Sequence, residues 1–325
     1  MTTPDPALPD FADVLGAAAR IAPHAHATPV LQSRALDAEA GATLRFKAEQ
    51  LQRAGAFKFR GACNAVFALD AAHAARGVVT HSSGNHGAAL ALAARLRGIP
   101  CHVVVPEGAV RAKLAAIAHY GAQLHPCAPT IQAREAACAQ VQADTGATVV
   151  HPYTDPRVIA GQGTAALELL TAHPDLEALV VPLGGGGLAA GAALAMRALA
   201  PACDLFLAEP TGADDGARSF AQGRLDHDFV PDTVCDGLRG TLGAINFTLL
   251  RAARAEVLTV DDADTVAAMR LLWTRTKQLV EPSSAIALAA VLARRERFAG
   301  RRVGIVLSGG NVDLDALAPL LARVR

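Results

Sequence analysis

Apolar and polar positions along the chain follow two alternating patterns. Short apolar runs, such as 101–105 and 178–183, take turns with longer segments such as 85–97, whose spacing suits a helix. The first pattern is typical of strands buried on both faces, and the second of helices. Strands that alternate with helices predict an α/β fold, in which parallel sheets are covered by helices.

The expected elements cover most of the chain. Strands are expected at 43–48, 77–80, 101–105, 122–125, 147–151, 178–183, 204–208, 256–260 and 302–307. Helices are expected at 11–21, 58–69, 85–97, 111–120, 130–144, 156–171, 188–199, 262–278 and 283–296. The region 210–245, rich in Gly, Asp and Arg, is the least regular. We interpret it as a functional loop region, because the alternation resumes after it.

Composition narrows the class of protein. Hydrophobic residues make up 52% of the 325 residues, and 30 Lys+Arg balance 30 Asp+Glu, so charge gives no reason to expect nucleic acid or an anionic membrane as partner. The chain has neither an apolar run long enough to span a membrane nor a start like that of a signal peptide. The six cysteines form no CxxC pair, which argues against a zinc site or a disulfide framework. We expect a soluble cytoplasmic protein with a small-molecule substrate.

Lys58 is the first candidate for chemistry. It lies between Phe57 and Phe59 in the segment GAFKFRGA, which has small residues on both sides. An apolar setting disfavours the ammonium form and lowers the pKa of a lysine, and a neutral amine can condense with an aldehyde. The alternative is a structural lysine whose ammonium group reaches solvent from a half-buried position.

Two loops that each follow a strand and open a helix could bind anions. Residues 81–87 (HSSGNHG) combine backbone N–H groups at a helix start with Ser, Asn and His side chains, and N-capping by a serine is the alternative. Residues 184–187 are four glycines, which let the backbone wrap a phosphate. The second loop also fits a relaxed dinucleotide fingerprint, through Gly185, Gly187 and Ala190 with Glu209 further on, so an NAD site has to be considered.

Two further turns carry polar groups. Glu209, Asp214 and Asp215 could bind Mg²⁺ or Ca²⁺ together with a backbone carbonyl, or could cap the next helix. In the turn LSGGN after the last strand, a serine hydroxyl could bond a ring nitrogen. The serines of the segment EPSSA at 281–285 are explained as helix caps.

Taken in order, the segments GAFKFRGA, SSGNHG, GGGG, EP-x-x-ADD, EPSSA and LSGGNVD resemble the fold-type II pyridoxal-phosphate (PLP) enzymes. Within these, the chain is similar to the serine/threonine dehydratase and serine racemase family over nearly its whole length. The resemblance implies two domains, each with a mostly parallel open twisted sheet flanked by helices. Residues 1–75 and 151–325 would form the large PLP-binding domain, and 76–150 the small domain with the substrate-carboxylate loop.

The resemblance also implies roles for individual residues. Lys58 would hold the cofactor and act in catalysis, with Ser83 as the acid/base on the opposite face. The remaining cofactor contacts would come from Phe57, Asn85, Gly184, Gly185, Gly186, Gly187 and Ser308. The substrate would meet Ser82, Ser83, Asn85, His86 and Arg134. Glu209, the carbonyl of Ala213 and Asp215 match the divalent-cation site of metal-activated members, which would hold Mg²⁺, Mn²⁺ or Ca²⁺. A homodimer is the family expectation.

The expected activity is β-elimination of L-serine and L-threonine to a 2-oxo acid and ammonia. The loop 236–241 has glycine where the racemase pattern has a substrate-binding serine, which favours dehydration over racemisation. Serine racemase and 3-hydroxyaspartate dehydratase are alternatives, the latter with Arg134 or Arg239 on the extra carboxylate. An NAD-dependent oxidoreductase is the alternative from another class, and it leaves Lys58 and Ser308 without roles.

Overall fold

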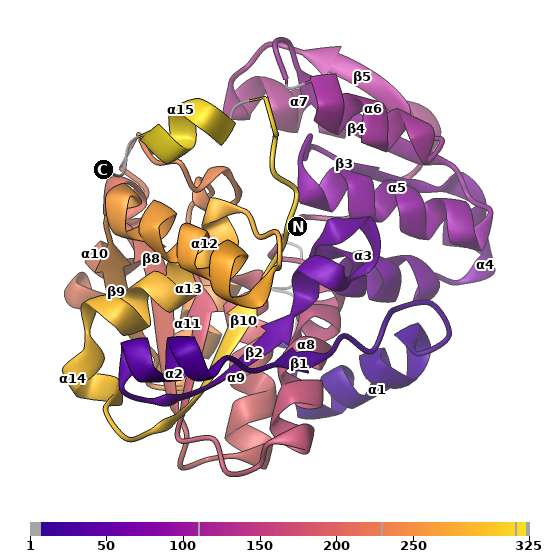
Figure 1. The fold of residues 1–325 in the computed structure, drawn as a ribbon. Helices are drawn as coiled ribbons and strands as arrows, with labels where there is room; N and C mark the ends of the chain where they lie inside the picture. The colour runs from indigo at the N-terminus through magenta and orange to yellow at the C-terminus, as the bar shows by residue number, and fades with distance from the viewer. Residues whose placement is uncertain (1–7, 110, 229, 316, 323–325) are drawn as a thin grey trace.

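A computed structural model describes residues 8–322 except 110, 229 and 316, and it contains two sheets (Figure 1). The larger has six strands in the order β1-β2-β10-β7-β8-β9. These are β1 (Val30–Leu31), β2 (Thr43–Ala48), β7 (Ala178–Pro182), β8 (Asp204–Pro210), β9 (Glu256–Val260) and β10 (Arg302–Leu307). All neighbours are parallel except β1 and β2, which pair antiparallel. The expected α/β class with mostly parallel sheets is confirmed.

Helices cover both faces of the larger sheet because successive side chains of a strand point to opposite sides. In β7, Val180 packs into a core with one group of helices, and its neighbour Val181 into a core with the other. The first group is α2 (Arg34–Ala40), α12 (Asp262–Thr276), α13 (Pro282–Ala293) and α14 (Arg295–Phe298). The second is α8 (Pro156–Ala172), α9 (Gly187–Leu199) and α11 (Ala244–Ala252). This two-sided burial explains the continuous apolar runs of the strands.

The smaller sheet is parallel, with the order β5-β4-β3-β6. Its strands are β3 (Val78–Thr80), β4 (Cys101–Pro106), β5 (Gln123–Cys127) and β6 (Thr148–Val149). One face packs with α3 (Lys58–Phe67), α4 (Ala71–Arg76), α5 (Asn85–Arg97) and α6 (Arg111–His119), and the other with α7 (Ile131–Thr145). The helix that begins at Lys58 therefore shares its core with the smaller sheet.

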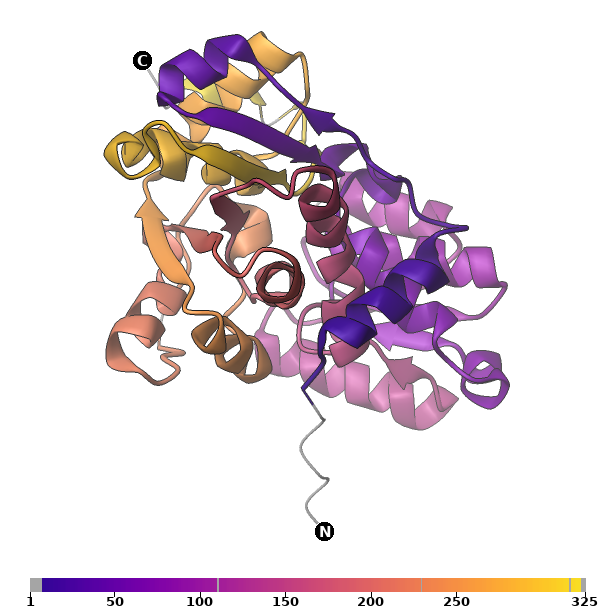
Figure 2. The same cartoon turned by 90° about the horizontal axis from the view of Figure 1, so that it is seen from below.

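Several elements were not predicted from the sequence. They are α2, α4, the antiparallel β1, α10 (Asp215–Gln222), α11, α15 (Leu317–Ala322) and the 3-10 turns η1 (Glu49–Leu51), η2 (Arg53–Gly55), η3 (Thr211–Ala213) and η4 (Asp236–Leu238). In Figure 2 the first two helices lie in different parts of the molecule. Helix α1 (Phe11–Ile21) lies against α8, and α2 lies near α12 and α13. The region 210–245 is thus partly helical, and two of its candidate residues lie in these elements, since Ala213 ends η3 and Asp215 begins α10.

Three of the candidate segments lie at the same edge of the larger sheet. The glycine loop follows β7, Glu209 lies near the end of β8, and Ser308 follows β10. Because these strands are parallel, their carboxyl ends meet at one edge, where α/β proteins bind ligands. Among the described residues, no helix is both long and apolar enough to span a bilayer.

Candidate active site

Lys58 is the first residue of α3, and the loop after β10 holds the segment before it. The Phe57 N–H donates to the Ser308 carbonyl at 2.9 Å, and the Gly310 N–H donates to the Gly55 carbonyl at 2.9 Å. Ala56 forms an isolated bridge with Gly309. Residues far apart in the sequence are thereby fixed side by side.

The amine of Lys58 is in a setting that favours its neutral form. Its Nζ donates to the Pro152 carbonyl at 2.9 Å and lies 5.1 Å from the centre of the Phe57 ring. Burial lowers its pKa from 10.5 to about 8, and the carboxylate of Glu281 opposes this shift. The acceptor of its hydrogen bond is a neutral carbonyl, so a nucleophilic amine is accessible near neutral pH.

The loop before α5 does not serve as a side-chain cap. Gly84 is the N-cap of α5, and no side chain caps that helix. The hydroxyls of Ser82 and Ser83 are partly buried and make no hydrogen bond to a described residue. The capping alternative is therefore wrong for these serines, and their donors, with the helix N-terminus, are available to an anion.

His86 and His151 are two neutral imidazoles near Lys58. His86 is buried, and because its Nε2 meets the Val150 carbonyl at 3.2 Å, that nitrogen carries the proton. Burial lowers its pKa well below 6.5. The Nδ1 of His151 accepts N–H groups of Tyr153 and Thr154, and burial lowers its pKa to about 4. His151 and Tyr153 were not predicted as site residues, since the sequence indicated only an extended segment there.

The four glycines are required by close contacts on both sides. A Cβ on Gly184 would lie 2.9 Å from the Leu238 Cα, and one on Gly185 would lie 2.4 Å from the Tyr153 ring. Gly186 has φ +90°, where side chains are strained. Gly187 opens α9, which has no side-chain cap. The backbone N–H groups at this helix start suit a phosphate.

A hydrogen-bond network joins the start of α5 to the larger sheet. The Asn85 side chain donates to Glu281 Oε1 at 3.0 Å, and Asn311 donates from its side chain to Asn85 Oδ1 at 2.9 Å and from its backbone to Glu281 Oε2 at 3.2 Å. Glu281 is buried and was missed because its position before α13 suggested only a helix start. Its carboxylate and the two amides form a fixed polar wall beside Lys58.

The serine interpretation at 281–285 needs a correction. No side chain caps α13, and Ser283 instead accepts the Gly237 N–H at 2.9 Å. The hydroxyl of Ser308, a buried residue, donates to the Ser283 carbonyl at 3.4 Å. This long bond leaves the Ser308 hydroxyl free to turn toward a better partner.

The two candidate arginines differ sharply. Arg239 donates twice to the Thr233 carbonyl, at 3.2 and 2.6 Å, so its guanidinium is already engaged. The Nε of Arg134 is buried and has no hydrogen-bond partner among the described residues. Burial lowers the pKa of His81, and the nearby positive charge of Arg134 lowers it further. Burial raises the pKa of Tyr153, and the charge of Arg134 opposes that shift. The structure thus brings Arg134 to the loop that carries Ser82.

The acidic turn lies behind the glycine loop. Glu209 and Asp215 are buried, and burial raises their pKa values to about 8 and about 6. Glu209 accepts the N–H groups of Gly216 and Ala217, and Asp215 Oδ2 accepts that of Leu242. Asp215 Oδ1 is buried without a hydrogen-bond partner in the described chain, and one carboxylate oxygen in that state suits a cation. No cluster of three His, Cys, Asp or Glu that could hold a metal occurs among the described residues, so a backbone carbonyl such as that of Ala213 and water would have to complete a site.

Together these groups fit one kind of cofactor. An amine with a lowered pKa, a glycine-lined helix start and a buried hydroxyl suit an aldehyde, a phosphate and a ring nitrogen of one flat molecule. The Tyr153 ring lies over Gly185, and the carbonyl of the preceding Pro152 accepts from Lys58, so the lysine and the glycine loop are neighbours. An NAD site explains neither the amine nor the hydroxyl.

Comparison with known proteins agrees with this chemistry. Residues 21–309 match the family described as pyridoxal-phosphate dependent enzymes. The chain is 49% identical over 310 residues to the beta-hydroxyaspartate dehydratase of Paracoccus denitrificans, covering 95% of this chain and 98% of that protein. It is 46% identical over 313 residues to the serine racemase of Arabidopsis thaliana, covering 95% of each. The solved structure of maize serine racemase is similar with a TM-score of 0.93 and 43% identity, covering 98% of both chains. The chain therefore belongs to the family of pyridoxal-phosphate dependent enzymes.

Proposed function

We propose that this enzyme eliminates the β-hydroxyl of 3-hydroxyaspartate and releases ammonia and the 2-oxo dicarboxylic acid oxaloacetate. Dehydration of 3-hydroxyaspartate is one of two alternatives to serine and threonine dehydration that the family resemblance leaves open, and serine racemisation is the other. The observation that carries it is the contrast between Arg134, which has a buried Nε without a described partner, and Arg239, which is bonded to a carbonyl. The 49% identity to a beta-hydroxyaspartate dehydratase supports the same choice.

The residues divide the work between cofactor and substrate. Bound PLP supplies the electron-accepting ring that makes a Cα proton removable. Lys58 holds the cofactor and, as a neutral amine, takes that proton, while Ser83 acts as acid/base on the other face. Phe57, Asn85, Ser308 and the glycines 184–187 hold the ring and phosphate.

The substrate is held at both ends in this proposal. The hydroxyls of Ser82 and Ser83 and the backbone N–H groups of Asn85 and His86 receive the α-carboxylate at the start of α5, where no side-chain cap competes. Arg134 receives the second carboxylate, because a guanidinium binds a carboxylate with two parallel hydrogen bonds. Serine and threonine lack that group and would leave Arg134 unsatisfied, which lowers their kcat/KM.

Steady-state kinetics on 3-hydroxyaspartate, L-serine and L-threonine test this proposal. We expect kcat/KM to be highest for 3-hydroxyaspartate and Arg134→Ala to lower it by roughly 10²–10³-fold, with less than about a tenfold loss for serine. Arg239→Ala is the matched control, because it removes the same charge from a residue bonded to a backbone carbonyl. Equal losses for both substrates in Arg134→Ala would contradict the assignment of the second carboxylate to this residue.

Serine racemisation is a second candidate activity. It is supported by the 46% identity to a serine racemase and by the Ser83 hydroxyl, which is free of described partners. The glycine in the loop 236–241 speaks against it as the main reaction. Chiral analysis of product from L-serine measures it directly: D-serine formed faster than pyruvate would make racemisation the principal activity.

A divalent cation is also part of the proposal. Glu209, the carbonyl of Ala213 and Asp215 would bind Mg²⁺ or Mn²⁺, supported by the buried, unpartnered Oδ1 of Asp215. Leu242, whose N–H bonds Asp215, also lies 2.7 Å from the position of a Cβ on Gly186. A cation here would hold the glycine loop in place.

The organisation of the protein completes the proposal. We assign residues 76–150, which contain the smaller sheet, to a substrate-binding domain, and 1–75 with 151–325 to the cofactor domain. The hydrogen bonds between Asn85, Glu281 and Asn311 would then join the two domains. A homodimer is proposed from the family resemblance, and a cytoplasmic location from the cysteines, which form no disulfide in the described chain.

A further inference from the structure

A cavity lies at the opposite edge of the larger sheet from the candidate active site. Its volume is about 340 Å³, and it is bordered by the last turn of α9, the start of β8 and the turn between α11 and β9. The strands between the two edges are five to seven residues long, which corresponds to roughly 20 Å. The cavity therefore shares no residue with the active site.

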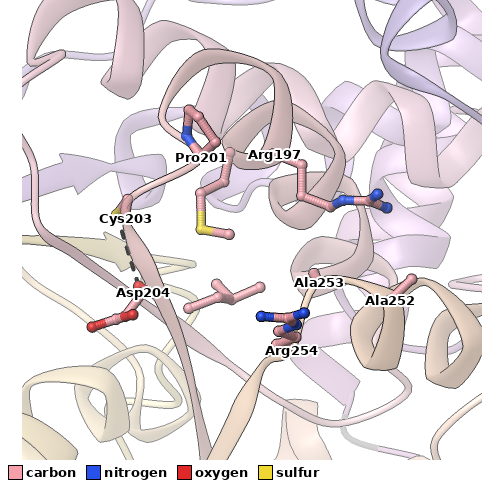
Figure 3. A pocket seen from close by; sticks show the side chains of 9 residues that line it. Arg197, Pro201, Cys203, Asp204, Ala252, Ala253 and Arg254 are labelled. Carbon is pink, nitrogen blue, oxygen red and sulfur yellow. Dashed lines mark hydrogen bonds between the residues drawn. The ribbon is translucent and has the colours of Figure 1, made fainter.

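The lining of this cavity is more polar than apolar, and its rim is cationic. Met196, Cys203 and Leu205 line it as buried side chains. Arg197 and Arg254 are exposed at its rim, and neither guanidinium group makes a hydrogen bond or ion pair to a described residue. Figure 3 shows the two arginines on one side of the opening and Asp204 on the other.

The balance of charge around the cavity is positive. The carboxylate of Asp204 is paired with Arg301 at 2.6 Å, so it does not neutralise the rim. The ends of α9 and α11 each contribute about half a negative charge, which together offset about one guanidinium. The second guanidinium remains uncompensated, and a ligand that enters should be anionic.

The backbone of Arg254 adds to the argument. It has φ +54°, a conformation that glycine adopts freely and other residues adopt with strain. It follows α11 at the position where helices commonly end with glycine. The long cationic side chain of Arg254 thus occupies a position where a glycine would fit the backbone better.

We infer that this cavity binds the phosphate group of a small molecule between Arg197 and Arg254. Guanidinium groups bind phosphate with two parallel hydrogen bonds, and the volume lies in the range of small-molecule sites. Such a site would be separate from the cofactor phosphate, and it does not depend on the proposed substrate.

Phenyl phosphate is a suitable probe for the PLP-loaded enzyme, in which the cofactor site is filled. We expect a Kd of about 1 mM or tighter by calorimetry at low salt, and weaker binding as ionic strength rises. Inorganic phosphate should bind with a similar Kd, because the two guanidinium groups contact the phosphate. Binding of phenyl phosphate without binding of inorganic phosphate would place the contact on the phenyl ring and would overturn the inference.

Variants locate the binding site. Arg197→Ala and Arg254→Gly should each weaken phenyl phosphate by about tenfold, and glycine suits the positive φ at position 254. Arg34→Ala is the matched control, an exposed arginine on α2 across the sheet, and it should leave the Kd unchanged. Failure of the wild-type enzyme to bind at about 10 mM, or binding that neither variant weakens, would overturn the inference.

Discussion

In the described part of the chain, Lys47 is fully buried and Lys58 is partly buried, and the difference between their surroundings separates a structural lysine from a reactive one. Lys47 belongs to a buried ion cluster with Glu49, Arg60 and Glu168, in which two cations meet two carboxylates. Its Nζ donates to Glu168 at 2.5 Å and to a backbone carbonyl at 2.6 Å. Lys58 instead donates to the neutral carbonyl of Pro152. Both pKa values are lowered by burial, but only Lys47 has bonded carboxylates that oppose the shift.

The cluster also supports the reactive lysine from a distance. Arg60 lies two residues after Lys58 on α3 and bonds Glu49 and Glu168, so it ties the start of that helix to η1 and α8. Burial opposes its charge, yet the two carboxylates raise its pKa above the ordinary value. A fully paired cluster is rigid, and a lysine placed beside it can be aimed.

The largest expected effect comes from removing the reactive amine. Lys58→Ala should lower kcat by at least about 10³-fold, because the variant loses both the cofactor attachment and the base. Its resistance to urea should change little, since no carboxylate loses a bonded partner. After borohydride reduction, mass spectrometry should find the pyridoxyl group on Lys58 rather than on Lys47, Lys113 or Lys277. A pyridoxyl group on another lysine would break the comparison.

The second effect concerns stability. Arg60→Met should destabilise the enzyme by about 3–5 kcal/mol in urea unfolding, because it leaves Glu49 buried without its guanidinium partner. Arg295→Met is the control: its ion pair with Glu39 is about half exposed on both sides and should contribute less than about 1 kcal/mol. Similar losses in the two variants would mean that the cluster does not differ from a surface pair.

Local sequence signals predicted the bounds of those helices whose terminal backbone groups are capped by residues adjacent in the sequence. The helix 11–21 has the predicted bounds because Asp10 and Asp13 form a capping box before an amphipathic stretch. The helix 85–97 ends as predicted because Gly98 adopts the left-handed conformation. By contrast α10 was missed. Its first N–H groups are accepted by Glu209, which lies in a strand, and that contact is visible only in three dimensions.

The candidate site contains two kinds of residue: those that belong to a local motif and those that are placed by contacts between distant parts of the chain. Motifs contiguous in sequence identified Lys58 and the glycine loop, because the chemistry of each is contained in a few neighbouring residues. Glu281 and Tyr153 carry no such signal. Glu281 contacts the site through its hydrogen bond with Asn85, which lies nearly two hundred residues earlier in the chain. The Tyr153 ring occupies the space that a side chain at position 185 would fill. Contacts of this separation depend on the packing of two sheets, which no local pattern encodes.

The buried carboxylate of Asp215 extends the comparison of Lys47 and Lys58 to an acidic group. Like Lys58, it has no oppositely charged partner in hydrogen-bond contact among the described residues. Chelation of divalent cations should lower the Tm by about 5 °C and reduce activity, and Mg²⁺ or Mn²⁺ should restore both. Asp215→Asn should have a lower Tm that no longer responds to chelator. Indifference of the wild-type enzyme to chelation would remove the metal from the proposal.

The smallest effect tests the charge nearest to Lys58. The carboxylate of Glu281 raises the pKa of Lys58 against the larger effect of burial, so Glu281→Gln should lower that pKa below about 8, by less than roughly one unit. Because a lysine with a folded pKa below 10.5 binds fewer protons than in the unfolded chain, apoenzyme stability should rise with pH between about 8 and 10.5, and in the variant this rise should begin at lower pH.

Reductive ¹³C-methylation followed by NMR titration reads the pKa directly, since the chain has lysines only at 47, 58, 113 and 277. Lys47 is the internal control, for its carboxylate partners are Glu49 and Glu168 and its titration should not move. A rise in the Lys58 pKa would show that hydrogen bonding through Asn85, and not the charge of Glu281, governs the amine.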